Sequence, residues 1–240
     1  MFLGIIIASS FLNELISMNN VKAVEDEAKT AGKLLKEASF EFDIVYTSFL
    51  KRAIHTMQIC LDEMGISKTT KKKNWRLNER HYGALQGLNK SETAQKYGEK
   101  QVHLWRRSYD ISPLKLDSND KRHPKYDLKY QKLKKYELPS GECLKDTVNR
   151  VMPFWDNDII PKVLSGKKIL IVAHGNSLRA IVKILDQISD EEIIGLNIPT
   201  GIPLIYKLDK KLNPIKNYYL GDLDELERRL ADVISQGKSN

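Results

Sequence analysis

The chain has 240 residues, of which 41% are hydrophobic, and this is enough to bury the core of a single domain. Its net charge of +8 raises the positive potential around the molecule, which suits a nucleic acid, an acidic membrane surface or a small polyanionic ligand. No apolar run approaches the roughly eighteen residues of a membrane helix, and residues 1–16 lack the basic start of a signal peptide, so we expect neither.

Hydrophobic periodicity predicts alternating helices and strands in the first half of the chain. An amphipathic helix is expected over residues 21–38, followed by a short strand at 43–47 and a second helix at 49–64. Residues 100–139 are rich in charge, proline and tyrosine without a clean period. They are interpreted as a long surface excursion of the kind that often forms a lid.

The second half continues the alternation. A helix is expected over residues 143–164 and a continuous apolar strand over 168–173, as in a strand covered on both faces. A helix at 178–185, an apolar run at 204–208 and a polar helix at 222–234 complete the pattern. The alternation predicts an α/β fold, with a doubly wound, mainly parallel sheet flanked by helices in a single domain.

Two local features bear on the expected partners and cellular compartment of the chain. The densest basic run, residues 68–73, has only Trp75 as a nearby aromatic, so it is interpreted as a solvated loop and no nucleic-acid partner is expected. Cys60 and Cys143 form neither a disulfide framework nor a metal-ligand pattern. A reducing cytoplasm is therefore expected.

The most informative polar pattern follows the 168–173 strand, where His174, Gly175 and Asn176 lead into the next helix. In doubly wound sheets, ligands bind outside the carboxyl ends of the strands. A helix N-terminus also offers N–H donors and a positive dipole end to an anion. These residues predict a phosphate cradle, and the alternative is a capped helix with a hydrogen-bonded histidine.

Two further groups suit the same ligand. Residues 77–87 (LNERHYGALQG) combine an acid, bases and an aromatic, and a partly desolvated Glu79 is a candidate to donate or accept a proton. Arg52, Arg106 and Arg107 carry guanidinium groups, which bind phosphate and carboxylate in bidentate geometry. The alternatives are a surface loop with incidental charges and ordinary surface arginines.

Five segments, in this order, resemble the signatures of the 2,3-bisphosphoglycerate-dependent phosphoglycerate mutases of the histidine phosphatase superfamily. They are SFLKRA at 48–53, LNERHYGALQGLNKSE at 77–92, WRRSYD at 105–110, AHGNSLR at 173–179 and NIPTGIP at 197–203. The resemblance runs from about residue 28 to residue 237. It implies an isomerase, an intramolecular phosphotransferase of glycolysis and gluconeogenesis, which interconverts 2- and 3-phosphoglycerate. The reaction passes through a phosphohistidine primed by 2,3-bisphosphoglycerate, and no metal is required.

The resemblance also implies roles for single residues and an assembly. Glu79 is expected to be the general acid and base, and His174 to stabilise the transferring phosphoryl group. The residues expected to bind the small phosphorylated acid are Arg52, Tyr82, Lys90, Arg106, Arg107, Gly175 and Asn176. Residues 123–130 (HPKYDLKY) depart from the Pro-Gly-His sequence of the family. A homodimer or homotetramer is expected.

The nucleophilic histidine of the family, in an Arg-His-Gly motif at the end of the first strand, is missing. The spacing of the family places it near the start of the chain, yet residues 1–27 contain neither histidine nor arginine, and the strand-like run at 2–7 leads into Ala-Ser-Ser. We therefore expect an aberrant segment over 1–27, a phosphoglycerate mutase-like domain over 28–240, and an inactive product of a frameshifted or wrongly started coding region, as in a pseudogene. The alternatives are a retained, non-catalytic phospho-ligand-binding protein and a nucleic-acid binder.

Overall fold

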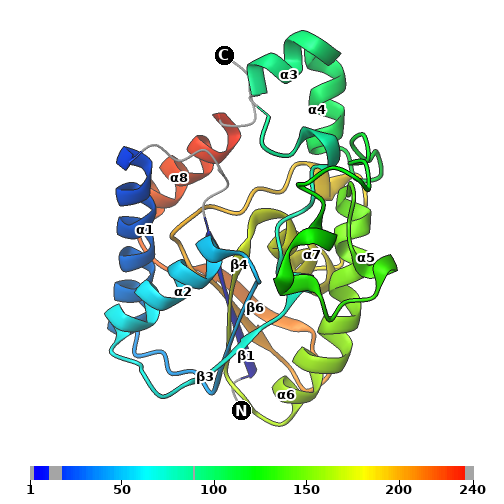
Figure 1. Cartoon of the computed structure of the whole chain (residues 1–240). Coiled ribbons are helices and arrows are strands. Elements are labelled where there is room, and N and C mark those ends of the chain that lie inside the picture. The colour runs from blue at the N-terminus through cyan, green and yellow to red at the C-terminus, as the bar shows by residue number, and fades with distance from the viewer. Residues whose placement is uncertain (1–2, 11–17, 89, 236–240) are drawn as a thin grey trace.

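The computed structural model describes residues 3–10, 18–88 and 90–235, which form one six-stranded sheet with helices on both faces (Figure 1). The strands follow the order β3-β2-β4-β1-β5-β6. Their bounds are β1 (Leu3–Ser10), β2 (Ile44–Thr47), β3 (Thr70–Lys73), β4 (Ile169–His174), β5 (Leu204–Leu208) and β6 (Pro214–Tyr219). Strands β1 to β4 run parallel, β5 is antiparallel to β1, and β6 is antiparallel to β5. The predicted α/β fold with a mainly parallel sheet is thus confirmed.

The helices of the described part divide between the two faces of the sheet. Their bounds are α1 (Met18–Glu37), α2 (Lys51–Met64), α3 (Lys90–Tyr97), α4 (Glu99–Arg107), α5 (Leu144–Phe154), α6 (Ile160–Leu164), α7 (Gly175–Leu185) and α8 (Leu223–Ser235). Helices α1 and α2 pack on one face, and α5, α6 and α7 on the other. In the described residues, no helix has the length and apolar character needed to cross a membrane.

Strand β4 is buried on both faces, which explains its continuous apolar sequence. Leu170 and Val172 join the core beneath α1 and α2, while Ile169, Ile171 and Ala173 join the core beneath α5 and α7. A strand covered on both sides needs apolar residues at every position rather than at every second one. The end of β4 is thereby fixed in the middle of the molecule, where the site lies.

Helices α1 and α2 approach each other closely at Gly32. A Cβ atom at this position would lie 2.6 Å from the Cys60 carbonyl oxygen, so only glycine allows the contact. The helix predicted over residues 143–164 also has a local irregularity. A π-helical turn at Trp155–Ile159 joins α5 to α6, directly after Pro153, which has no N–H to donate.

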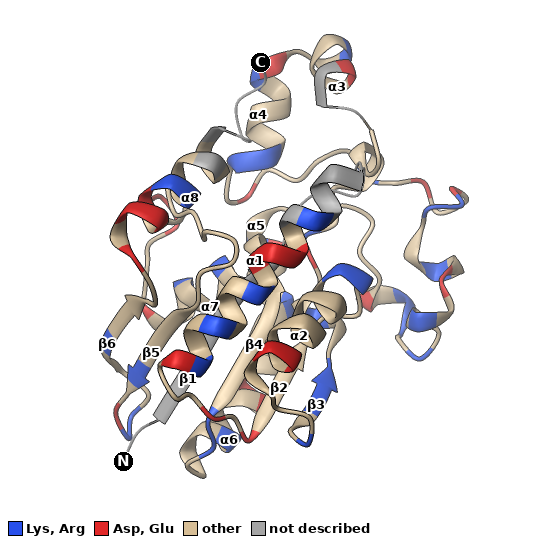
Figure 2. Ribbon diagram, turned by 90° about the vertical axis from the view of Figure 1, so that its left-hand side faces the viewer, with Lys and Arg blue, Asp and Glu red and all other residues tan. Residues whose placement is uncertain are grey.

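Three details of the predicted elements were wrong. The lysine-rich run is an edge strand, β3, rather than a loop, although all four of its residues are exposed (Figure 2). Lysines on an edge strand discourage pairing with other chains, and they give no apolar period from which to predict a strand. Residues 99–107 form helix α4, so the excursion begins at Ser108, and β6 was not predicted. Both elements bury few side chains, which explains their weak signals.

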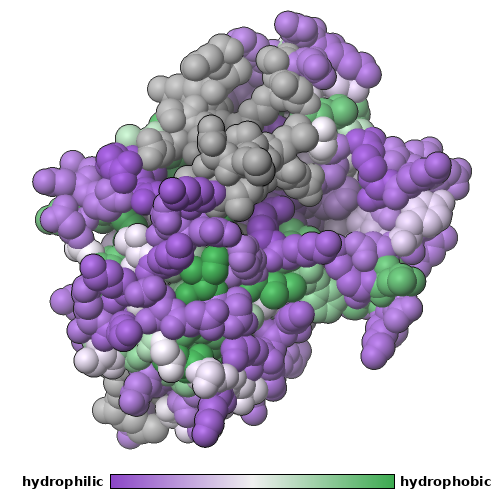
Figure 3. Space-filling view, turned by 60° about the vertical axis from the view of Figure 1, so that its left-hand side comes forward, coloured by the Kyte–Doolittle hydropathy of each residue, from purple (hydrophilic) through white to green (hydrophobic). Residues whose placement is uncertain are grey.

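The surface agrees with the high content of charged residues. The face in Figure 3 is mainly hydrophilic, with hydrophobic side chains visible in small groups between polar ones. Charged residues make up 29% of the chain.

Candidate active site

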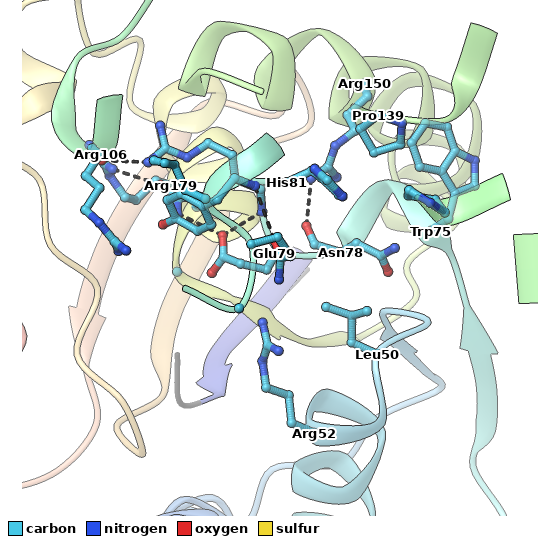
Figure 4. Close-up of a pocket in the computed structure, with 18 of the residues that line it drawn as sticks. Leu50, Arg52, Trp75, Asn78, Glu79, His81, Arg106, Pro139, Arg150 and Arg179 are labelled. Atoms are coloured by element: carbon cyan, nitrogen blue, oxygen red, sulfur yellow. Dashed lines mark hydrogen bonds between the residues drawn. The ribbon is translucent and has the colours of Figure 1, made fainter. Parts of the chain in front are cut away.

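A pocket of about 340 Å³ lies where β4 ends and α7 begins. Its walls come from the start of α2, the loop at 75–88, the end of α4, the excursion, α5 and the first turn of α7 (Figure 4). The wall contains eight basic side chains and two carboxylates. The basic residues are Arg52, Arg80, Arg106, Arg107, Arg122, Lys129, Arg150 and Arg179, and the acidic ones are Glu79 and Asp127. Such an excess of positive charge in a concave site attracts a polyanion.

His174 closes β4 and stands directly before α7, and its side chain is fully buried. Its Nδ1 accepts a hydrogen bond from Arg52 Nε at 3.3 Å, and its Nε2 lies 2.8 Å from Ser48 Oγ. Burial, together with the charges of Arg52 and Arg150, holds the pKa of His174 well below its usual value. The ring is therefore neutral at pH 7. Because Nδ1 accepts, the proton is on Nε2, which donates to Ser48.

Glu79 lies in the loop that follows the 3₁₀ turn Trp75–Leu77 and is 8% exposed. Its Oε1 accepts from the Arg80 N–H at 2.7 Å and from Asn176 Nδ2 at 2.8 Å. The same amide of Asn176 donates to Tyr82 Oη at 3.2 Å. Among the described residues, the other carboxylate oxygen, Oε2, is buried without a hydrogen-bond partner. An orphaned carboxylate oxygen beside a pocket is an acceptor held ready for a ligand proton.

The arginines of this wall are crowded together. The guanidinium groups of Arg80 and Arg106 both lie over the Tyr82 ring, at 4.8 and 5.2 Å from its centroid. Within the described part of the chain, Arg80 Nε and Nη1, Arg106 Nε and Arg179 Nε are buried without an acceptor. Burial, then the charges of Arg80 and Arg107, lowers the pKa of Arg179 to about 10. Unsatisfied and mutually repelling donors of this kind indicate a site for an anion.

The excursion contributes part of the wall of the pocket. Tyr130 is buried there, accepts a hydrogen bond from Asn78 Nδ2 at 2.8 Å and stacks on Phe49 with ring centroids 6.0 Å apart. Burial raises the pKa of Tyr130 to about 12. The segment in which the sequence departs from the family pattern therefore contributes a packed residue to the pocket.

The structure brings almost all of the predicted site residues together. The residues that line the pocket are Arg52, Glu79, Tyr82, Arg106, Arg107, Gly175 and Asn176. His174 lies behind Arg52, to which it is hydrogen-bonded. The side chain of Lys90, at the start of α3, lies outside the described part of the chain. Sequence reasoning missed Asn78, Arg80, Arg122, Arg150 and Arg179. For the buried Arg80, Arg150 and Arg179, nothing local distinguishes a buried arginine from an exposed one.

Two comparisons with other sequences agree with this geometry. The sequence model of the histidine phosphatase superfamily (branch 1) matches residues 24–121 and 114–212. The 2,3-bisphosphoglycerate-dependent phosphoglycerate mutases of Borreliella burgdorferi strain ZS7 and Borreliella afzelii strain PKo are each 59% identical over 213 residues, which is 89% of this chain and 86% of theirs. The chain belongs to this mutase family. It is therefore related to a family of isomerases.

Solved structures support the fold of the mutase family. A mycobacterial glucosyl-3-phosphoglycerate phosphatase is 16% identical, covers 91% of this chain and 96% of its own, and superimposes with a TM-score of 0.61. The alpha-ribazole phosphatase of Shigella flexneri has the same identity and coverage and a TM-score of 0.60. At this identity the likeness concerns the fold alone.

The N-terminal strand is the element at whose end the resemblance leads us to expect the nucleophilic histidine. Strand β1 lies in the centre of the sheet, between β4 and β5, and Ser10 is in register with His174. Its last three residues are Ala8, Ser9 and Ser10. The sequence of this strand, and of the residues that follow it up to residue 27, contains no histidine.

Proposed function

We propose that the chain binds 2- or 3-phosphoglycerate in this pocket and interconverts them at a very low rate. The proposal extends the activity in the name of the relatives to this chain. It is carried by one observation: eight basic side chains line a pocket that also contains a buried carboxylate oxygen, Glu79 Oε2, without a partner among the described residues. Basic groups suit the phosphate and carboxylate of the ligand, and the carboxylate oxygen suits its hydroxyl group.

In the proposed complex, Arg52, Arg106 and Arg107 bind the anionic groups of the ligand. Glu79 Oε2 takes the proton from the hydroxyl group that receives the phosphoryl group and delivers a proton to the ligand oxygen from which that group departs, while Asn176 and Tyr82 hold the carboxylate in place. The Gly175 N–H, at the positive end of the α7 dipole, donates to a phosphate oxygen. Neutral His174 contributes by orienting Arg52.

The expected primer is 2,3-bisphosphoglycerate, which in this family supplies the phosphoryl group carried by the nucleophilic histidine. The residues suit such a group, because Arg80 Nε and Nη1, Arg106 Nε and Arg179 Nε are buried donors without an acceptor within the described residues. Two phosphates and a carboxylate would satisfy donors that otherwise remain desolvated and unpaired.

The proposed rate is very low because residues 1–27 contain no histidine. His174 does not replace the nucleophile, since it is fully buried and both ring nitrogens have partners. His81 lines the pocket, but its Nδ1 accepts from the Gly83 N–H at 3.0 Å. Loss of a covalent nucleophile costs many orders of magnitude, about 10⁶-fold in one protease.

Calorimetry with 3-phosphoglycerate and with 2,3-bisphosphoglycerate tests the binding half of the proposal. We expect micromolar affinity that Arg107→Ala abolishes and Arg228→Ala, at an exposed ion pair on α8, leaves unchanged. Absence of heat at every concentration would reject the proposal. A coupled assay with 3-phosphoglycerate tests the second half, because rapid turnover by the purified chain would contradict the low rate.

A retained phospho-ligand-binding protein is the second candidate function. It is favoured by the combination of an intact basic pocket with a β1 that ends without histidine. Micromolar affinity without turnover, and without a phosphorylated side chain after incubation with 2,3-bisphosphoglycerate, identifies this function. The coding sequence upstream of residue 28, read in all three frames, tests the frameshift origin, because an Arg-His-Gly run out of frame would reveal it.

The proposal also covers the cellular compartment and the oligomeric state of the chain. Cys60 and Cys143 are both buried free thiols, which suits a cytoplasmic glycolytic protein. A homodimer or homotetramer is proposed from the family resemblance, and light scattering of the purified chain measures the assembly directly.

A further inference from the structure

We infer that a buried ion pair between Arg150 and Glu142 positions Glu79, by holding the loop at residues 76–81 from both sides. Arg150 lies in the middle of α5, and Glu142 stands just before that helix. The inference rests on the proposed function, because it connects the pair to the residue that would move the proton.

The pair is buried and bidentate. Arg150 Nε lies 2.6 Å from Glu142 Oε1, and Arg150 Nη2 lies 3.3 Å from Glu142 Oε2. Each side chain is only 7% exposed. Two parallel N–H to oxygen contacts fix the relative orientation of both planar groups.

The remaining hydrogen bonds of the pair go to the main chain of the Glu79 loop. Arg150 donates to the Asn78 carbonyl oxygen at 2.8 Å (Figure 4). It also donates to the Arg76 carbonyl oxygen. Glu142 Oε2 accepts from the His81 N–H at 2.7 Å, and the Glu142 N–H donates to the His81 carbonyl oxygen at 2.8 Å. The ion pair is therefore hydrogen-bonded to the main chain at Asn78, one residue before Glu79, and at His81, two residues after it.

The charges of this pair are better explained by a role in positioning Glu79 than by a contribution to the stability of the fold alone. Burying two charges costs desolvation free energy, and apolar residues of similar volume often serve stability as well or better. Here the charged groups reach the main chain of a loop that is not held within a sheet, and that loop carries the orphaned Glu79 Oε2. A displacement of about 1 Å at such a group costs roughly 100-fold in catalysis.

The neighbouring pair between Arg76 and Glu137 provides a matched comparison. Arg76 Nη2 lies 3.1 Å from Glu137 Oε1, and Arg76 Nη1 donates to the Arg150 carbonyl oxygen. This pair touches the same loop at its first residue, but it does not bond the main chain on either side of Glu79. Glu137→Gln therefore removes a nearby ion pair but keeps the hydrogen bonds that Arg150 and Glu142 make to the main chain on either side of Glu79.

The test uses Glu142→Gln in the full chain, followed by NMR at pH 7 without ligand. The amide can accept at only one of the two former oxygen positions, so either the His81 N–H or the Arg150 Nε–H loses its acceptor. We expect the Arg80 amide, which bonds Glu79 Oε1, to exchange with solvent roughly tenfold faster, while the Ile171 amide in β4 keeps its rate. The Glu79 Cδ resonance, assigned with Glu79→Gln, should move, and the affinity for 3-phosphoglycerate should fall.

Other outcomes distinguish the positioning role of the pair from a role in stability only, and both from the proposed function. If Arg80 and Ile171 exchange faster by the same factor and the Glu79 resonance stays in place, the pair serves stability only and the inference is rejected. If the parent chain does not bind 3-phosphoglycerate, the proposed function fails, while the ligand-free NMR still decides the positioning role. Glu142→Asp, which keeps the charge beside Arg150, gives the same readout if Glu142→Gln does not fold. Glu137→Gln should leave both signals unchanged.

Discussion

Asn176 donates its side-chain amide to Glu79 Oε1 across 2.8 Å, so the first turn of α7 holds a carboxylate that lies 97 positions earlier in the chain. The phosphate cradle and the acid–base residue are therefore one connected unit. A change in the cradle is expected to disturb the carboxylate.

Replacing Asn176 with aspartate should weaken this unit. The substitution keeps the shape but removes the donor and places a second carboxylate beside Glu79, where like charges repel. We expect a loss of about 1–3 kcal/mol in the free energy of unfolding, measured by urea denaturation at pH 7. Asn217→Asp is the control, because Asn217 donates to Asp186 at an exposed site. Equal losses in the two variants would contradict the special role of Asn176.

The buried histidine predicts a pH dependence of stability. The pKa of His174 is lower in the folded chain than its usual value of 6.5, mainly because of burial and then because of Arg52. The unfolded chain therefore binds the proton more readily, and stability present above about pH 6.5 is lost as the pH falls below it. His174→Gln should flatten the fall in melting temperature between pH 6.5 and 5, and exposed His55→Gln should not. A wild-type slope in His174→Gln would refute this.

The turn at Gly83 predicts a large effect of a single methyl group. Gly83 has a φ of +59°, and a Cβ atom there would lie 2.1 Å from the Leu114 carbonyl oxygen. Gly87 has a φ of +74° but nothing within 4 Å of such an atom. We expect Gly87→Ala to cost about 1 kcal/mol for its backbone conformation, and Gly83→Ala to cost roughly 1–3 kcal/mol more because of the clash. Urea titration of both variants measures the difference, and similar midpoints would refute it.

Arg122 is expected to fasten the excursion to the pocket. It pairs with Asp120, whose pKa its hydrogen bonds lower to about 2, and it donates to the Gln86 carbonyl oxygen at 2.6 Å. Arg122→Ala should speed tryptic cleavage within residues 117–137 while leaving the melting temperature nearly unchanged, because exposed pairs contribute little to stability. Arg228→Ala, at another exposed bidentate pair, should not alter the rate of cleavage within residues 117–137. Unchanged cleavage in Arg122→Ala would contradict the proposed role of Arg122 in holding the excursion against the pocket.

The sequence predicts the phosphate cradle, because the residues of the cradle directly follow a strand in the chain. The apolar run that becomes β4 is followed directly by His174, Gly175 and Asn176, so the position of these residues at the sheet edge follows from the pattern alone. Arg150 is different. Its helix is predictable, but its burial depends on Glu142 and on the carbonyl groups of a loop more than sixty positions earlier. Such pairing is set by tertiary contacts, which no local period encodes.

The central place of β1 has a consequence for biosynthesis. Leu3–Ser10 leaves the ribosome early, yet the strands on either side of it, Ile169–His174 and Leu204–Leu208, are translated far later. Until then its apolar segment has two open edges, which are prone to association with other nascent chains. Chaperones that shield extended hydrophobic segments should therefore matter more for the yield of this polypeptide than for proteins whose neighbouring strands are translated consecutively.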